Sequence, residues 1–123
     1  MGAEKRFDLV LLGPGTDGHT ASLFPGTTAL QEQEQPAVAV YVEKLQAWQV
    51  TLTPPTINAA RHVTFIVAGA SKAERLREVL HGLYRPEELP AQSIRPQEDH
   101  LLWLLDRAAA IGLQLTEDER AFD

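Results

Sequence analysis

Asp17 and His19 are the residues whose types and spacing point most directly to chemistry. Asp17 lies in the glycine-rich segment 13–18, and His19 is the residue that follows this segment, two positions after Asp17. Imidazole titrates near neutral pH, so His19 is suited to take a proton from water with a carboxylate beside it. The pair predicts general-base chemistry. The less specific alternative is a tight turn with a surface aspartate and a histidine that helps to cap a helix.

The glycines of this segment are candidate binding positions. Glycine permits positive φ and lets backbone N–H groups come close to a ligand. The spacing matches neither the dinucleotide-binding pattern nor the P-loop, which needs Gly-Lys followed by Ser or Thr. The candidate ligand-binding glycines are Gly13, Gly15 and Gly18.

Lys72 is the second candidate for a ligand contact. Ser71 and Glu74 have the spacing of a capping box, which puts Lys72 in the first turn of a helix. A lysine there opposes the positive end of the helix dipole, unless an anion is shared between it and the helix amides. The alternative is that Lys72 is an ordinary surface lysine whose charge is solvated by water.

Hydrophobic patterns predict the elements that position these residues. Strands are expected at 7–12, 37–42, 49–53, 62–68 and 101–105, and the first of them reads as a fully buried interior strand. Helices are expected at 19–23, around 59–61 after a cap at Thr56 or Asn58, and from Ser71 to Gly82. This alternation predicts an α/β fold with a mostly parallel sheet flanked by helices.

Composition limits the class of protein. The chain has 123 residues with 44% hydrophobic residues and no cysteine, which excludes a disordered tail, a collagen-like repeat and a disulfide-stapled mini-protein. A net charge of −6 makes nucleic acid an unexpected partner. No apolar run is long enough to span a membrane, and the first residues lack a secretory h-region. We expect one cytoplasmic domain over residues 1–123, with a frayed tail at 116–123.

The remaining candidates carry weaker signals. His62 is expected to cap or hydrogen-bond locally, and His81 and His100 to lie on the surface. No histidine spacing suggests a metal site. Arg61 could face a ligand or solvent, and both options stay open. The two tryptophans, Trp48 and Trp103, are expected to be packing residues.

Residues 7–26 closely resemble the signature of the 6-phosphogluconolactonases, within the wider glucosamine-6-phosphate isomerase/deaminase superfamily. Residues 51–61, 67–73, 89–92 and 103–109 resemble further blocks of that family in the same order. The resemblance covers nearly the whole chain. It implies the C-terminal half of the NagB/RpiA-like fold.

The resemblance implies hydrolysis of 6-phosphogluconolactone to 6-phosphogluconate, a step of the oxidative pentose phosphate pathway. His19 would be the general base for water, and Asp17 would orient the imidazole or hold the sugar. Lys72 would bind the phosphate of the sugar, with Arg61 and the loop glycines as further substrate contacts. The implied partner is a small phosphorylated sugar lactone, and no metal or organic cofactor is implied.

Two alternatives stand beside lactone hydrolysis. The isomerase and deaminase branch of the superfamily typically has a glutamate five residues after the histidine, whereas this chain has Phe24 there. The second alternative is a non-catalytic sugar-phosphate-binding or assembly fragment.

The resemblance also implies a missing part. Relatives carry an N-terminal half ahead of the block that begins at Phe7, with a glycine-rich phosphate loop and an acidic-arginine segment that this chain lacks. Gln49 stands where a basic residue is common in the family. If half the sheet is absent, the strand at 7–12 becomes an unprotected edge, and we expect self-association through it.

Overall fold

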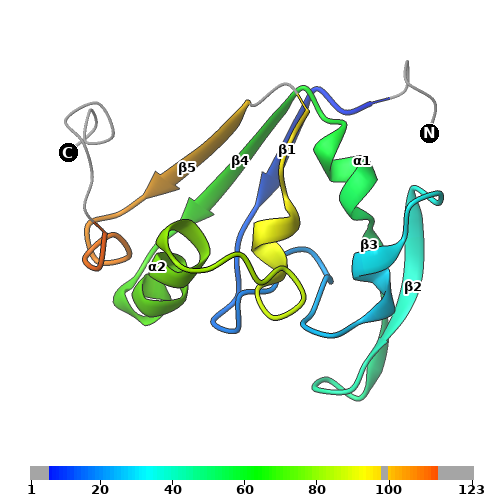
Figure 1. Cartoon of the computed structure of the whole chain (residues 1–123), viewed down its shortest axis with the longest axis horizontal. Coiled ribbons are helices and arrows are strands. Elements are labelled where there is room, and N and C mark those ends of the chain that lie inside the picture. The colour runs from blue at the N-terminus through cyan, green and yellow to red at the C-terminus, as the bar shows by residue number, and fades with distance from the viewer. Residues whose placement is uncertain (1–5, 98–99, 114–123) are drawn as a thin grey trace.

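The fold is built on a three-stranded parallel sheet. A computed structural model of the chain describes residues 6–97 and 100–113. Strands β1 (Leu9–Leu12), β4 (His62–Val67) and β5 (Leu101–Leu105) lie in the order β1-β4-β5, and both pairings are parallel. Figure 1 shows the three strands side by side. The tail predicted at 116–123 lies outside the described residues.

A separate hairpin and a short helix lie between β1 and β4 in the chain. Strands β2 (Ala37–Val42) and β3 (Ala47–Leu52) pair antiparallel and form their own two-stranded sheet. Helix α1 (Pro54–Asn58) follows, with two prolines in its first turn, where no backbone N–H is needed. Figure 1 shows α1 between the hairpin and the larger sheet. The predicted α/β class with a mostly parallel sheet is confirmed.

Helix α2 (Ala73–His81) links β4 to β5 and is held at its C-terminal end by Gln92. The buried Gln92 side chain donates its Nε2 hydrogens to the carbonyl oxygens of Glu78, Val79 and Leu83 at 3.0–3.2 Å. The Glu78 oxygen also accepts a hydrogen bond from the Gly82 backbone N–H at 3.0 Å, and Gln92 adds a partner for the carbonyls in and after the last turn of the helix. Three 3₁₀ turns complete the described elements: η1 (Thr28–Gln31), η2 (Ala70–Lys72) and η3 (Pro90–Ser93).

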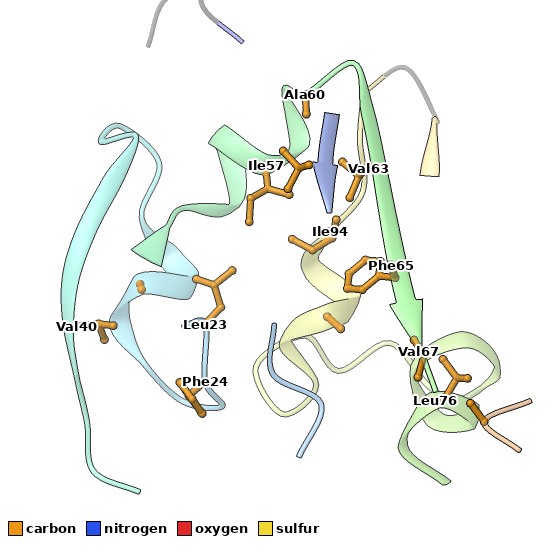
Figure 2. Close-up of a cluster of buried hydrophobic side chains, with 14 of the residues drawn as sticks. Leu23, Phe24, Val40, Ile57, Ala60, Val63, Phe65, Val67, Leu76 and Ile94 are labelled. Atoms are coloured by element: carbon orange, nitrogen blue, oxygen red, sulfur yellow. The ribbon is translucent and has the colours of Figure 1, made fainter. Parts of the chain in front are cut away.

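The hydrophobic core lies on one face of the three-stranded sheet. Val63, Phe65 and Val67 of β4 are at most 3% exposed and belong to the same cluster as Leu76 of α2 and Ile94 after η3. Figure 2 shows Val63 and Phe65 on the side of β4 where Ile94 lies. The helical layer therefore covers this face.

The first strand is not fully buried, contrary to the prediction. Leu9 and Leu11 of β1 are 53% and 59% exposed, whereas Val10 between them is buried. The described part of the chain covers only one face of the sheet, so alternate residues of β1 are exposed. The expectation that this strand lies at a sheet edge is confirmed, because β4 is the one partner of β1 among the described strands.

Three helix predictions need correction. Residues 19–23 form turns and isolated bridges instead of a helix, because Ala21 takes a φ of 50°. The short helix expected around 59–61 begins earlier, at Pro54, since the two prolines start a helix instead of merely ending the strand. Helix α2 has no side-chain cap, because Ser71 lies in η2 and a backbone bond from Lys72 N–H to the Gly69 oxygen begins the first turn.

The two tryptophans differ. Trp103 stacks on Phe65 with ring centroids 4.0 Å apart, as expected of a packing residue. Trp48 is 70% exposed, and its described ring contact is with Tyr41 across the hairpin, so it packs far less than predicted. The hairpin face that carries Trp48 has no layer over it in the described part of the chain.

None of the helices in the described residues is long and apolar enough to cross a membrane.

We expect Phe65→Ala to destabilise the fold by about 3–5 kcal/mol, because it removes a fully buried ring from the centre of the core. Ile66→Ala is the matched control in the same strand. Its side chain is 53% exposed, so a loss below about 1 kcal/mol is expected. Urea denaturation followed by circular dichroism measures both. Equal losses would show that the two faces of β4 are not packed as described.

Candidate active site

The glycine-rich loop leaves the carboxyl end of β1 and folds back on itself. Gly15 N–H donates to the His19 carbonyl oxygen at 2.8 Å, and Gly18 N–H donates to the Gly15 oxygen at 3.1 Å. Gly18 takes a φ of 85°, as expected for glycine in a tight loop. The N–H groups of Gly15 and Gly18 thus take part in hydrogen bonds that close the loop.

Asp17 and His19 are in direct contact across this loop. The His19 backbone N–H donates to Asp17 Oδ1 at 3.1 Å, and the ring nitrogen Nδ1 hydrogen-bonds to the same oxygen. A carboxylate only accepts hydrogen bonds, so Nδ1 carries the hydrogen. In a neutral imidazole the lone pair then lies on Nε2, which is the nitrogen able to accept a proton.

The His19 ring is held between Phe24 and Gly15. Phe24 stacks on it with centroids 4.1 Å apart and an angle of 18° between the ring planes. On Gly15, a Cβ would lie 2.1 Å from Cε1 and 2.2 Å from Nδ1 of His19. Gly15 is therefore required by the position of the ring, and its own φ is not positive.

Lys44 adds a third hydrogen bond to the Asp17 carboxylate, and the sequence analysis did not single it out. It lies in the turn between β2 and β3, and its Nζ donates to Asp17 Oδ2 at 2.9 Å. Burial of Asp17 opposes ionisation, but the hydrogen bonds from Lys44 and then His19 outweigh it. The pKa of the Asp17 carboxyl is therefore held well below its ordinary value. No local pattern marks Lys44, since it is a charged residue in a hairpin turn 27 positions away.

Lys72 contacts the same loop from the turn that follows β4, the neighbour of β1 in the sheet. Its Nζ donates to the Pro14 carbonyl oxygen at 2.6 Å. Lys72 stands at the junction of η2 and α2, just beyond the carboxyl end of β4, which is parallel to β1. The parallel pairing therefore brings Lys72 and the loop to one edge of the sheet, where ligands bind in open α/β sheets.

A shallow depression too narrow to admit a water molecule lies between the loop and α2. Arg75, a second residue that the sequence analysis did not single out, donates from Nε to the Thr16 carbonyl oxygen at 3.3 Å. Its position one turn after Lys72 on α2 is the only sequence signal for it. The depression is lined by Pro14, Gly15, Gly18, Lys72, Arg75, Leu76, Val79 and Trp103.

Arg61 is not brought to this site. It precedes β4, so it lies at the opposite end of the strand from Lys72, and its Nε pairs with Asp8 Oδ1 at 3.1 Å. Gly13 ends β1 beside the Ile66 carbonyl oxygen, where a Cβ would make ordinary contact at 3.7 Å. Of the residues singled out in the sequence, the structure therefore gathers the loop and Lys72 and leaves Arg61 apart.

The other histidines lie away from the loop. His62 and His100 stack on each other with centroids 4.7 Å apart, and His81 is exposed at the end of α2. Within residues 6–97 and 100–113, no three His, Cys, Asp or Glu side chains gather as a metal site would require.

Comparisons with known proteins identify similar chains. A family model described as "Glucosamine-6-phosphate isomerases/6-phosphogluconolactonase" matches residues 2–103. A 6-phosphogluconolactonase from Synechocystis sp. is 46% identical over 108 residues, and one from Homo sapiens is 44% identical over 105 residues. The solved structure of 6-phosphogluconolactonase from Trypanosoma cruzi aligns with a TM-score of 0.76 at 33% identity.

The three alignments cover most of this chain but less than half of each relative. They include 88%, 85% and 89% of this chain, and 44%, 40% and 42% of the relatives from Synechocystis sp., Homo sapiens and Trypanosoma cruzi. The resemblance found in the sequence blocks, restricted to the C-terminal half of the relatives, is confirmed.

We expect Gly15→Ala to displace the His19 ring, because the new methyl group would occupy the position of the ring edge. Gly13→Ala is the matched control, since its methyl group would make only ordinary contact. The histidine side-chain signals in NMR spectra should change in Gly15→Ala and stay in place in Gly13→Ala. An unchanged His19 signal in Gly15→Ala would contradict the described loop.

Asp17→Asn should destabilise the protein in a pH-dependent way. A carboxyl group with a lowered pKa in the folded state adds stability above its unfolded-state pKa of about 3.9 and loses it as the pH falls below that value. The difference in free energy of unfolding between the native chain and Asp17→Asn should have its largest value near about pH 7 and decrease below about pH 4. Urea denaturation at several pH values measures this difference.

Asp8→Asn serves as the control for this series. The Asp8 side chain is 92% exposed, so a change within about 0.5 kcal/mol is expected throughout the pH range. A deficit of Asp17→Asn that stays constant down to acid pH would contradict the interaction of Lys44 and His19 with an ionised Asp17.

Proposed function

The chain belongs to the glucosamine-6-phosphate isomerase/6-phosphogluconolactonase family, and from this premise we propose that it carries the catalytic loop of a hydrolase acting on 6-phosphogluconolactone. The observation that carries the proposal is the contact between His19 Nδ1 and Asp17 Oδ1. It fixes the neutral tautomer in which Nε2 accepts a proton, and this is what a general base for water requires.

The reaction needs one proton to leave a water molecule and return. His19 Nε2 takes the proton as the water oxygen attacks the carbonyl carbon of the lactone. The tetrahedral oxyanion collapses, the bond from that carbon to the ring oxygen breaks, and the imidazolium returns the proton to the ring oxygen. Asp17 stays ionised and stabilises the imidazolium. These steps use an ester carbonyl, water and a base, so the proposal includes no cofactor.

The phosphate of the substrate is assigned to Lys72. An ammonium group has three hydrogen-bond donors, and Lys72 uses one of them on the Pro14 carbonyl oxygen. The other hydrogens remain for phosphate oxygens at the edge of the catalytic loop. Because the chain carries a net charge of −6, a phosphorylated ligand needs such a local cation.

Isomerase or deaminase activity is disfavoured by the neighbour of His19. In that branch of the superfamily a glutamate pairs with the histidine, whereas here Phe24 stacks flat on the ring. A phenyl ring neither accepts nor donates the protons that ring opening of an amino sugar phosphate requires. Among the activities of the family, the geometry therefore favours hydrolysis.

A second candidate function is sugar-phosphate binding without turnover. The observation that favours this binding function is the position of Lys72 against the glycine loop. At this position the Lys72 ammonium group could bind a phosphate whether or not the lactone is hydrolysed. Binding of the product 6-phosphogluconate would then depend on Lys72 and not on His19.

His19→Ala is expected to lower kcat for 6-phosphogluconolactone by about 100-fold or more, since it removes the general base. Acid release in a pH-stat, corrected for the spontaneous hydrolysis of the lactone, measures the rate. His81→Ala removes an exposed histidine at the end of α2 and should leave the rate unchanged. An unaltered rate in His19→Ala would refute the assigned base.

Calorimetric titration of the same chain with 6-phosphogluconate separates the two candidates. Saturable hydrolysis supports the lactonase proposal, whereas binding without hydrolysis that weakens in Lys72→Ala supports the binding function. Arg61→Ala is the control, because it also removes one positive charge but at the other end of the sheet, where Arg61 pairs with Asp8. It should leave the binding of 6-phosphogluconate unchanged.

A further inference from the structure

A cavity separate from the catalytic loop carries one arginine, and we call it the Arg95 cavity. Its volume is about 460 Å³, which lies within the range of sites that hold small molecules. Its walls come from four segments: the 3₁₀ turn η1, helix α1, the loop after α2 and the segment after η3. None of residues 13–19 lines it, and neither does Lys44 or Lys72. The cavity therefore shares no side chain with the proposed site of lactone hydrolysis.

Arg95 supplies the positive charge of this cavity. Its guanidinium carbon lies over the Tyr84 ring, 3.9 Å from the ring centroid. A guanidinium group held against an aromatic ring keeps N–H donors at its edge, where they match the two oxygens of a carboxylate or phosphate. Within the described part of the chain, no carboxylate pairs with Arg95, whereas Arg75 and Arg85 both pair with Glu78. The donors of Arg95 are therefore open to a ligand.

The backbone that carries Arg95 is fixed by Asn58 at the end of α1. Asn58 Oδ1 accepts a hydrogen bond from the Arg95 N–H at 2.6 Å, and Asn58 Nδ2 donates to the Ser93 carbonyl oxygen at 3.0 Å. The Gln97 N–H donates to the Asn58 carbonyl oxygen at 3.3 Å. Three hydrogen bonds to one residue thus hold this segment, so little backbone freedom is lost when a ligand binds.

The loop that carries Tyr84 is fixed by the buried Gln92. Gln92 Nε2 donates to the Leu83 carbonyl oxygen at 3.0 Å, and Gln92 Oε1 accepts a hydrogen bond from the Arg85 N–H at 2.6 Å. Tyr84 stands between these two backbone groups. The aromatic ring and the guanidinium group over it are therefore both positioned by the fold before a ligand arrives.

The rest of the lining indicates the size and chemistry of the ligand. Four side chains give the cavity hydrocarbon surface: Leu30, Pro54, Pro55 and Pro86. Glu87 also lines it, and its Oε1 accepts a hydrogen bond from Gln31 Nε2 at 3.3 Å. A single inorganic ion would leave most of the cavity unfilled. An anion with an attached apolar group uses both the guanidinium group and the hydrocarbon surface.

We propose that the Arg95 cavity binds a small organic anion, with its carboxylate or phosphate group on the Arg95 guanidinium and its apolar part against Leu30 and the three prolines. Carboxylates and phosphates offer the same pair of oxygens to a guanidinium edge, so the experiment compares the two. The site is additional to the proposed lactonase function and does not depend on it.

Titration of the ¹⁵N-labelled chain followed by NMR tests the proposal. The probes are phenyl phosphate and phenylacetate, which carry a phenyl ring with either anion. We expect saturable shifts of the Arg95 Nε–H signal and of the Tyr84 and Gln97 backbone N–H signals, and the probe that binds more tightly identifies the preferred anion.

Two substitutions of Arg95 separate its shape from its charge. Arg95→Gln should weaken the affinity for the tighter probe by about tenfold or more, since it removes hydrogen bonds to a charged group. Arg95→Lys keeps the charge but loses the planar edge, so a loss of about threefold or more is expected. Arg95 is exposed, so neither change should alter the fold, and the remaining NMR signals report this directly.

Three controls accompany the titration. Arg77→Gln removes an exposed arginine of α2 outside the cavity and should leave the affinity unchanged. Lys72→Ala should also leave it unchanged, which separates this site from the proposed substrate site. Benzyl alcohol has a phenyl ring without a charge and should bind more weakly than either anion.

Three results would overturn the proposal. The first is a set of shifts that does not saturate with either probe. The second is an affinity that Arg95→Gln leaves unchanged or that benzyl alcohol matches. The third is an affinity that falls in Lys72→Ala and not in Arg95→Gln, which would assign the anion to the catalytic loop. None of these readouts measures lactone hydrolysis, so the outcome is separate from that of the proposed function.

Discussion

The parallel pairing of β1 with β4 is the constraint on which the candidate site depends. Parallel strands end at the same edge of a sheet, so the loop after β1 and the turn after β4 emerge together. This is why Lys72 reaches the Pro14 carbonyl oxygen across 58 positions of sequence. Fully buried Phe65 at the centre of β4, stacked on Trp103 of β5, holds this arrangement from the core side.

Within the loop, the position of one imidazole ring accounts for most of the neighbouring residue types. Phe24 covers one side of the His19 ring, and the absence of a side chain on Gly15 leaves room for it. Asp17 fixes its tautomer, and Lys44 keeps that carboxylate ionised. The electrostatics of the site are therefore local, as they must be in a chain of net charge −6.

The two faces of the larger sheet differ in what packs on them. The core face holds the helices that place Lys72 and the loop, and alternate residues of the same strands form an apolar surface open to solvent. A strand that alternates between a buried Val10 and exposed Leu9 and Leu11 looks, in sequence, like an interior strand. Apolar residue type alone therefore gave the wrong burial for β1.

The sequence by itself determined the α/β class, all five strands, and the likeness of its blocks to one family, because these depend on local patterns of hydrophobicity, glycine and short motifs. It also singled out Asp17, His19 and Lys72. Only the tertiary structure decided that Lys44 binds Asp17, that Arg61 lies at the far end of the sheet, and that Trp48 is exposed. These facts depend on contacts between residues distant in the chain, which spacing along the sequence does not encode.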